Sequence, residues 1–171
     1  MNLSKPEYRE KDSVSYVNRL TKGENMKKHT YPNEPKLKYY KLSTQQKRKL
    51  VETLKEKLEN VDEIVFAYLH GSFIERESFR DVDVAIWLKR KEKAFQYTVD
   101  FSARLEAEMK IPIDIQVLNE APLPFKHHVL TKGKLLFSKD ENLRHKLVDL
   151  TIRQYIDLKQ LIAAVKEETK E

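Results

Sequence analysis

The feature that most constrains this chain is residues 66–89, which read FAYLHGSFIERESFRDVDVAIWLK. Residues 65–69 are apolar and β-branched or aromatic, which predicts a strand that ends just before Gly71. The chain has only 3 glycines, so one at a strand end indicates a sharp turn or a close approach to the main chain. Ser72 and Glu75 have the spacing of a capping box, so a short helix is expected to begin there. The unpaired N–H groups at the start of such a helix suit a phosphate.

The second apolar run, residues 81–88, is expected to form a strand whose two faces differ in chemistry. With a period of two, Asp81 and Asp83 face the same side as Ala85 and Trp87, and aliphatic residues face the other side. Two carboxylates on one strand face repel each other, so a cation is expected between them. Carboxylates two residues apart, at roughly 7 Å along a strand, can converge on one or two divalent ions. Ligands that are all oxygen favour Mg²⁺ or Mn²⁺ over zinc.

The pattern of Gly71-Ser72, a spacer, and then Asp81-Val82-Asp83-Val84 resembles the signature of the DNA polymerase β-like nucleotidyltransferase superfamily. The small size resembles the minimal nucleotidyltransferase (MntA-like) branch of that superfamily, and the resemblance covers residues 43–171. It implies an α/β (α+β) fold in which a small mixed sheet of about four strands is flanked by helices, with a long helix at the C-terminus. The spacer of 8 residues between Ser72 and Asp81 is shorter than in many members of the superfamily.

The same resemblance implies a third carboxylate on a later strand. Asp114 fits this position, because it alternates with the apolar Ile113 and Ile115. The resemblance implies that Asp81, Asp83 and Asp114 bind two Mg²⁺ ions, or Mn²⁺, and catalyse transfer of AMP from ATP to a hydroxyl group. For the minimal branch, the implied acceptor is a tyrosine of a cognate HEPN-type (HepT) toxin. The chain would then be the antitoxin of a type VII-like toxin–antitoxin pair.

Four residues between the two strands are candidates for binding the nucleotide. Gly71 and Ser72 would open the helix under the phosphates, although a helix cap without a ligand is the simpler interpretation. Arg76 and Arg80 are candidates to neutralise a triphosphate, although arginines on a short exposed helix are usually only solvated.

Two other functions are compatible with parts of the pattern. One is a small-molecule nucleotidyltransferase like those that modify aminoglycosides, and the other is a non-catalytic module that binds a nucleotide or a partner. Retention of Asp81, Asp83 and Asp114 argues against the non-catalytic module. A template-directed polymerase is disfavoured because the chain offers no domain to grip DNA. The toxin itself is not encoded here, because the R-x4-6-H-x-Y motif typical of it is missing.

Composition indicates one globular domain preceded by a basic extension. The chain has 171 residues, of which 40% are hydrophobic and 35% are charged, and it has 0 cysteines, which favours a reducing compartment. It contains neither an apolar run of ~18 residues nor a signal peptide, so a cytoplasmic location without a membrane is expected. Residues 1–42 carry 10 basic and 5 acidic side chains, whereas residues 43–171, the expected nucleotidyltransferase domain, carry 23 and 22. Nucleic-acid binding is therefore expected only through this basic arm, for which plain solvation is the preferred interpretation.

Apolar periodicity and capping signals predict the remaining elements. Helices are expected over residues 43–60, 93–110, 122–132 and 140–168, and a short fourth strand over residues 135–137. The second of these helices would bring the Asp114 strand beside the Asp81 strand. His127 and His128 are adjacent on the third helix, so they point about 100° apart and cannot chelate one metal together.

Overall fold

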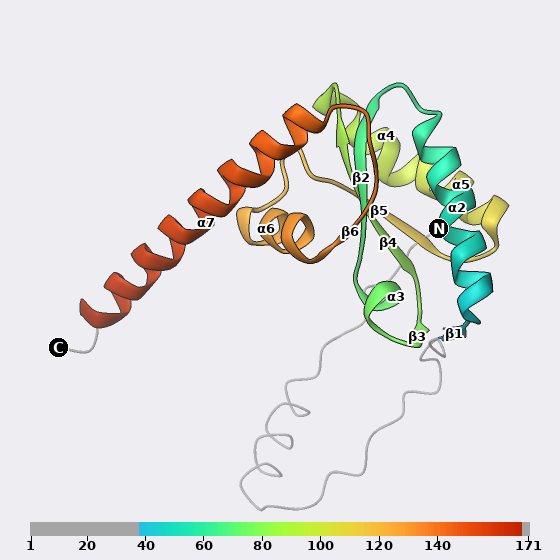
Figure 1. Cartoon of the computed structure of the whole chain (residues 1–171), viewed down its shortest axis with the longest axis horizontal. Coiled ribbons are helices and arrows are strands. Elements are labelled where there is room, and N and C mark those ends of the chain that lie inside the picture. The colour runs from blue at the N-terminus through green and yellow to red at the C-terminus, as the bar shows by residue number, and fades with distance from the viewer. Residues whose placement is uncertain (1–37, 169–171) are drawn as a thin grey trace, which may run out of the picture. The chain divides into compact units, whose positions relative to one another are not determined.

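The computed structural model describes residues 38–168, so most of the predicted basic extension lies outside the described residues. Its centre is a four-stranded sheet with the strand order β5-β4-β2-β6 (Figure 1). The strands are β2 (Ile64–His70), β4 (Val82–Leu88), β5 (Ile113–Val117) and β6 (Lys134–Ser138). β4 and β5 are parallel, whereas β2 is antiparallel to both β4 and β6. The predicted α+β class with a small mixed sheet is confirmed.

The two faces of the sheet are covered by different helices. On β4, Val82, Val84 and Ile86 are fully buried in the cluster that includes residues of α2 (Thr44–Glu59) and α5 (Ser102–Met109). The other face of the sheet packs against α6 (Leu123–Lys132) and the start of α7 (Glu141–Glu168). Figure 1 shows α2 and α5 on one side of the sheet and α6 on the other. The alternation predicted for this strand is therefore confirmed.

Helix α2 begins and ends where its sequence signals predicted. The Ser43 hydroxyl accepts a hydrogen bond from the Gln46 backbone N–H at 3.2 Å, and the Gln46 side chain accepts one from the Ser43 N–H at 2.8 Å. This reciprocal capping box satisfies N–H groups that the helix itself leaves unpaired. Leu54 and Leu58, four residues apart on one helix face, are fully buried against the sheet.

The segment predicted as one helix over residues 93–110 is helical but not regular. A 3₁₀ turn (Lys91–Lys93) and a short α-helical turn, α4 (Ala94–Gln96), lead into a π-helical turn (Tyr97–Phe101) and then into α5. The apolar residues here are spaced four apart. In a regular α-helix, each would be rotated roughly 40° beyond a full turn relative to the one before it. The wider π turn offsets this drift, so Tyr97 and Phe101 stay in contact with ring centroids 5.4 Å apart.

A second, two-stranded sheet was not predicted. β1 (Tyr40–Lys41) pairs antiparallel with β3 (Ser78–Phe79), and the Tyr40 ring stacks on the Phe79 ring at 5.9 Å. Strands of two residues have no alternation that a sequence pattern can detect. The pairing anchors the start of the described chain to the segment between Gly71 and Asp81.

Helix α6 connects the sheet to the C-terminal helix. Pro122 is its N-cap and Gly133 its C-cap, as expected. The His127 ring stacks on the Tyr155 ring of α7 with centroids 3.9 Å apart, and His128 is exposed. The two histidines therefore face different surroundings, as their spacing predicted.

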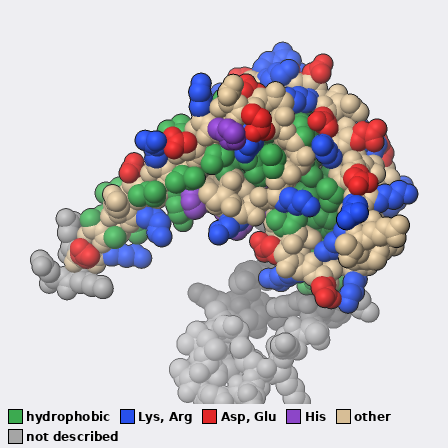
Figure 2. All heavy atoms as spheres, in the orientation of Figure 1, with side chains coloured by type: hydrophobic (Ala, Val, Ile, Leu, Met, Phe, Trp, Pro, Cys, Tyr) green, Lys and Arg blue, Asp and Glu red, His purple; other side chains and the backbone are tan. Residues whose placement is uncertain are grey.

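The long C-terminal helix predicted from the sequence is α7, which packs on the sheet only near its start. Leu143 and Leu147 pack against the sheet cluster, but Leu161 and Val165 are 62% and 51% exposed. A helix of 28 residues is about 42 Å long, far longer than a small sheet. Its last turns therefore extend past the body in Figure 1, and Figure 2 shows apolar side chains along them. Within residues 38–168, no helix combines the length and apolarity needed to span a membrane.

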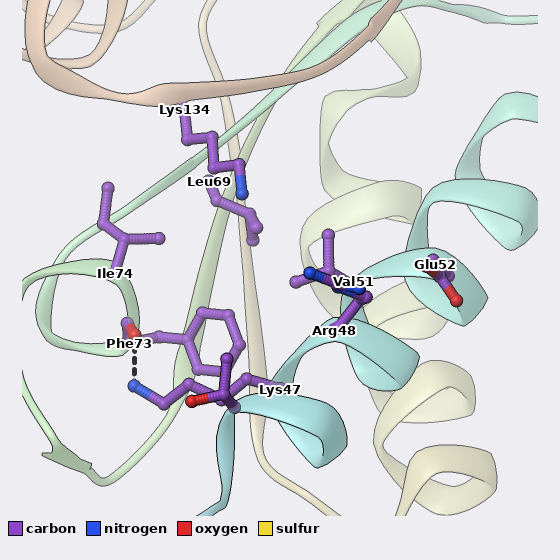
Figure 3. A pocket seen from close by; sticks show the side chains of 9 residues that line it. Lys47, Arg48, Val51, Glu52, Leu69, Phe73, Ile74 and Lys134 are labelled. Carbon is purple, nitrogen blue, oxygen red and sulfur yellow. Dashed lines mark hydrogen bonds between the residues drawn. The ribbon is translucent and has the colours of Figure 1, made fainter.

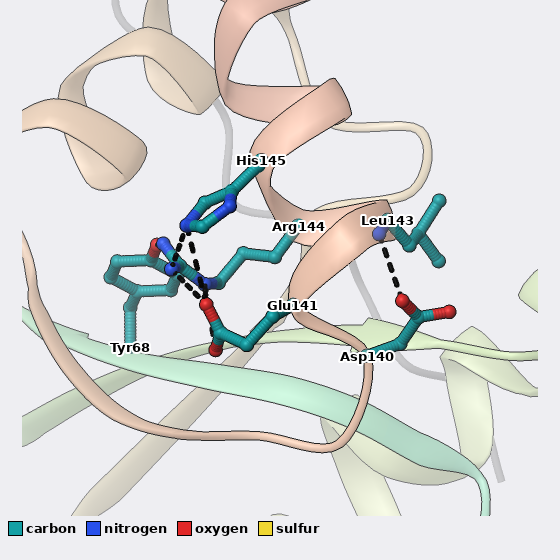
Figure 4. A network of polar contacts seen from close by, with 6 residues as sticks. All are labelled: Tyr68, Asp140, Glu141, Leu143, Arg144 and His145. Carbon is teal, nitrogen blue, oxygen red and sulfur yellow. Dashed lines mark hydrogen bonds and ion pairs between the residues drawn. The ribbon is translucent and has the colours of Figure 1, made fainter.

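Arg144 attaches α7 to the sheet (Figure 4). Its guanidinium donates to the Tyr68 hydroxyl at 3.0 Å, and it forms an ion pair with Glu141. The Arg144 side chain is only 15% exposed, and Tyr68 lies in the central strand β2. The neighbouring Glu141 raises the pKa of Arg144, so its charge is permanent.

Replacing Arg144 by methionine is expected to lower the free energy of unfolding by about 1–2 kcal/mol, because the Tyr68 hydroxyl loses its donor. Urea denaturation followed by circular dichroism measures this. The matched control is Arg153→Met on the same helix, where the Arg153 side chain is 74% exposed and pairs with the exposed Asp149. That variant should change stability by less than about 0.5 kcal/mol. Equal losses in the two variants would contradict the anchoring role of Arg144.

Candidate active site

The three predicted carboxylates lie at one end of the two parallel strands. Asp83 in β4 is the register partner of Asp114 in β5, and Asp81 directly precedes β4. Residues paired in register on neighbouring strands point to the same face, so Asp83 and Asp114 are side by side. Asp114 is exposed, whereas Asp81 and Asp83 are partly buried. The structure thus brings Asp83 and Asp114 together from segments that are distant in the sequence.

Gly71 lies directly against the Asp83 carboxylate. Its φ of 71° belongs to a region that side chains other than glycine rarely adopt. A Cβ atom at this position would lie 3.0 Å from Asp83 Cγ and still closer to Oδ2. The glycine is therefore needed both for its backbone conformation and for the space that Asp83 occupies, which confirms the close approach expected here.

The capping box predicted for Ser72 and Glu75 is wrong. Helix α3 (Ser72–Glu75) has Gly71 as its N-cap, and no side chain caps it. The Gly71 carbonyl accepts hydrogen bonds from the N–H groups of Ile74 and Glu75 at 3.2 and 3.3 Å. The positive φ of Gly71 thus places the N-cap one residue earlier than expected. Ser72 becomes the first helical residue, so its hydroxyl is not at the capping position.

The two candidate arginines lie in different places. Arg76 ends α3, at the opposite end from Gly71, and its carbonyl accepts a hydrogen bond from Lys47 Nζ at 2.8 Å. Arg80 is exposed, and its charge lowers the pKa of Asp83, so it acts on the carboxylate site. Of the two, Arg80 is the one whose charge acts on Asp83.

Within the described residues, the carboxylate site has an excess of negative charge that Arg80 offsets only in part. Burial, followed by repulsion from Asp81 and Asp114, raises the pKa of Asp83 to about 6. The Gln116 side-chain amide donates to Asp114 Oδ2 at 2.7 Å and so fixes that carboxylate. Among residues 38–168, no three acidic or histidine side chains converge closely enough to hold one ion as they stand. An all-oxygen donor set with unneutralised charge nevertheless fits the chemistry of a divalent cation such as Mg²⁺.

The raised pKa of Asp83 predicts how stability depends on pH without a metal. The folded state holds this proton more tightly than the unfolded state, whose pKa is 3.8, so the stabilisation is complete at low pH. It is lost as the pH rises through about 6. The expected loss is about 1–2 kcal/mol, since the carboxyl keeps part of its solvation.

Unfolding free energies of the native protein and the Asp83→Asn variant, measured from pH 4 to 8 in the presence of a chelator, would test this. The native protein should become less stable than the variant as the pH rises. A constant difference across this range would contradict it.

Sequence reasoning missed His70, the last residue of β2. It is 6% exposed, and its Nε2 has no hydrogen-bond partner within the described chain. His70 pairs with Asp83 from strand β2, whereas Asp114 pairs with Asp83 from strand β5. Burial lowers the pKa of His70, which keeps the imidazole neutral near pH 7. The alternation of β2 could have revealed it. Phe66, Tyr68 and His70 are every second residue of this strand, so they point to the same face as Asp83.

Comparison with known proteins agrees with this geometry. The family model described as Polymerase beta, Nucleotidyltransferase matches residues 52–142, more than half of the chain. The fold and the site therefore define a nucleotidyltransferase. The chain belongs to the polymerase β nucleotidyltransferase family. No curated protein matches the chain.

Solved structures share the fold. A chain of the complex described as tri-AMPylated Shewanella oneidensis HEPN toxin with MNT antitoxin matches with a TM-score of 0.55 and 18% identity, over 73% of this chain and 99% of that one. A chain of the toxin–antitoxin complex MntA–HepT matches with a TM-score of 0.54 and 18% identity, over 72% and 99%. A chain of a toxin–antitoxin structure with AMP-PNP matches with a TM-score of 0.54 and 19% identity, over 73% and 98%. At such low identity, these matches show the fold alone.

Proposed function

We propose that this nucleotidyltransferase transfers AMP from ATP to a tyrosine hydroxyl of a HEPN-type toxin, and thereby acts as the antitoxin of that toxin. The observation that carries the proposal is the register pairing of Asp83 with Asp114, next to Asp81, in a site of unneutralised negative charge. Such a site suits metal-dependent chemistry on a triphosphate. The family supplies the reaction class.

The three aspartates and Arg80 each have a role in this proposed reaction. Asp81, Asp83 and Asp114 would hold Mg²⁺, which when bound neutralises the triphosphate and makes the attacking hydroxyl more acidic. Asp114, the most exposed of the three, would accept the hydroxyl proton. The hydroxyl oxygen then forms a bond to the α-phosphorus of ATP, and the bond from that phosphorus to the leaving pyrophosphate breaks. Arg80, whose charge already acts on Asp83, would offset the charge of the phosphates.

The choice of a protein acceptor rests on two observations. The structures that share this fold include a complex with an AMPylated HEPN toxin and one with AMP-PNP. In addition, α7 presents a row of exposed apolar side chains, which include Ile156, Leu161 and Ile162. Exposed apolar surface of this kind is typical of a protein contact. A protein bound along this part of α7 would be attached to the helix whose start packs on the sheet that carries the carboxylates.

Labelling with α-³²P-ATP tests the proposal directly. The full-length protein would be incubated with Mg²⁺ and labelled ATP, with and without a HEPN-type protein encoded beside it. We expect label on the partner, loss of this label when its acceptor tyrosine is changed to phenylalanine, and no label with the Asp81→Asn/Asp83→Asn variant. The Asp100→Asn variant is the matched control, because Asp100 is an exposed aspartate on the π turn between β4 and α5.

Two outcomes would contradict the proposal in different ways. Label on a small molecule, but not on the partner, would leave the reaction class in place and replace the acceptor. Retained binding of ATP with no transfer to any acceptor would indicate a nucleotide-binding module.

A further inference from the structure

We propose that this protein has a second ligand site, a pocket for a small amphiphilic anion between α2, α3 and β6 (Figure 3). The pocket has a volume of about 510 Å³, which is within the range of small-molecule sites. Leu69 in its lining belongs to the core cluster on the α2 side of the sheet, whereas Asp83 faces the α6 side. The pocket is therefore separate from the carboxylate site, and this inference goes beyond the proposed function.

The inner wall of the pocket is apolar and rigid. Leu69 and Phe73 are 0% and 3% exposed, so the protein core holds both in place. Val51 of α2 and Ile74 of α3 are partly buried and complete this wall. Leu69 and Phe73 form the buried floor, so an apolar body would displace water mainly from Val51 and Ile74.

The rim of the pocket carries two cations without a partner among the described residues. Arg48 on α2 and Lys134 on β6 are both exposed, and neither forms an ion pair or a side-chain hydrogen bond within the part of the chain that the structure describes. Figure 3 shows Lys134 entering from β6 and Arg48 from α2. The lining has a single acid, Glu52, so positive charge prevails there. A phosphate or carboxylate head on an apolar body complements this rim and wall.

The third cation of the lining, Lys47, is already engaged and connects the pocket to α3. Its Nζ donates to the carbonyl of Phe73 at 3.0 Å and to that of Arg76 at 2.8 Å. These bonds hold α3, whose start at Gly71 lies against Asp83. A ligand packed against Phe73 and Ile74 should therefore stiffen α3, so that the N–H groups of Ile74 and Glu75 exchange more slowly with solvent.

Octyl phosphate is the first probe, because it combines the required head with a flexible apolar body. AMP is the second, so that a nucleotide is distinguished from a lipid-like anion, and octanol is the uncharged control. Each is titrated below its micelle-forming concentration into the ¹⁵N-labelled full-length protein, without Mg²⁺ or ATP. We expect octyl phosphate, AMP or both to shift the amide signals of α2, α3 and β6 saturably, at concentrations where octanol does not.

Different variants test the contributions of the charged rim and of the apolar wall to binding. The Arg48→Ala/Lys134→Ala variant should weaken binding at least tenfold, because both charges that face the head are lost. Lys55→Ala removes a charge from the same helix, where Lys55 pairs with Glu59 at 4.0 Å, and should leave binding unchanged. Val51→Trp fills the pocket with both cations in place and should abolish binding. Circular dichroism confirms that each variant is folded.

The proposal would be overturned if neither anion shifts these signals up to several millimolar, or if octanol binds as well as octyl phosphate. Equal binding by the Arg48→Ala/Lys134→Ala variant would also overturn it. None of these measurements involves nucleotide transfer, so their failure would leave the proposed transfer reaction untouched. Conversely, an inactive protein could still bind the anion in this pocket.

Discussion

Replacing Asp83 by asparagine is expected to reduce nucleotide transfer at least a thousandfold, which corresponds to about 4 kcal/mol of transition-state stabilisation. The reason is that Asp83 is the central carboxylate of the site, since it pairs with Asp114 and its pKa also responds to Asp81. An amide cannot neutralise a bound cation. Single-turnover labelling of the acceptor at saturating ATP and Mg²⁺ measures the rate of the chemical step.

The same substitution should leave the protein folded and slightly more stable above pH 7, because it removes a charge that burial and two neighbours disfavour. This combination distinguishes a catalytic role from a structural one. The Asp100→Asn control should retain full transfer, since Asp100 is exposed on a different segment. Transfer by the Asp83→Asn variant within tenfold of the native rate would show that Asp83 does not take part in the reaction.

Replacing Gly71 by alanine is expected to impair both stability and transfer. The φ of 71° costs roughly 1–2 kcal/mol for any residue with a Cβ atom. The new methyl group must also displace the Asp83 carboxylate, whose Cγ lies 3.0 Å from the position of the added Cβ. We expect the free energy of unfolding to fall by about 2–4 kcal/mol and transfer to fall at least a hundredfold. Urea denaturation and the labelling assay at low temperature measure the two effects separately.

Gly133→Ala provides the matched control for this variant. Its added Cβ would meet backbone atoms, 2.5 Å from the Val129 carbonyl oxygen and 3.0 Å from that of Leu69, so stability should also fall. Gly133 is not next to a carboxylate, however, and the folded fraction of this variant should transfer normally. If Gly71→Ala and Gly133→Ala lose stability and transfer in the same proportion, the effect of Gly71 acts through folding alone.

Local patterns were sufficient for most of the elements. The alternation of residues 81–88 predicted both β4 and its buried face, and the Ser43 and Gln46 pair predicted the start of α2. Both signals act between residues a few positions apart, so they are readable from the chain without knowledge of its partners. Patterns of this kind do not show how far an element extends past its neighbours. The apolar side of α7 follows from its sequence, but only the structure shows that its last turns extend beyond the sheet.

The candidate site was only partly predictable. The sequence identified Asp81, Asp83 and Asp114 as candidates, and their roles as metal ligands stay predictions. It did not show His70 opposite Asp83, nor that Gln116 holds Asp114. It also assigned the N-cap of α3 to Ser72 instead of Gly71, because the hydrogen bonds accepted by the Gly71 carbonyl form only in the folded backbone conformation.

By itself, the sequence determined most of the strands and helices, which side of β4 is apolar, and which acids are candidates for catalysis. Only the tertiary structure decided that Asp83 lies beside Asp114 and over Gly71, and that α2, α3 and β6 enclose a pocket with a cationic rim. The physical reason is the range of the forces involved. Periodicity and capping reflect contacts within one turn or one strand, whereas strand register and pocket walls depend on packing between segments far apart in the chain.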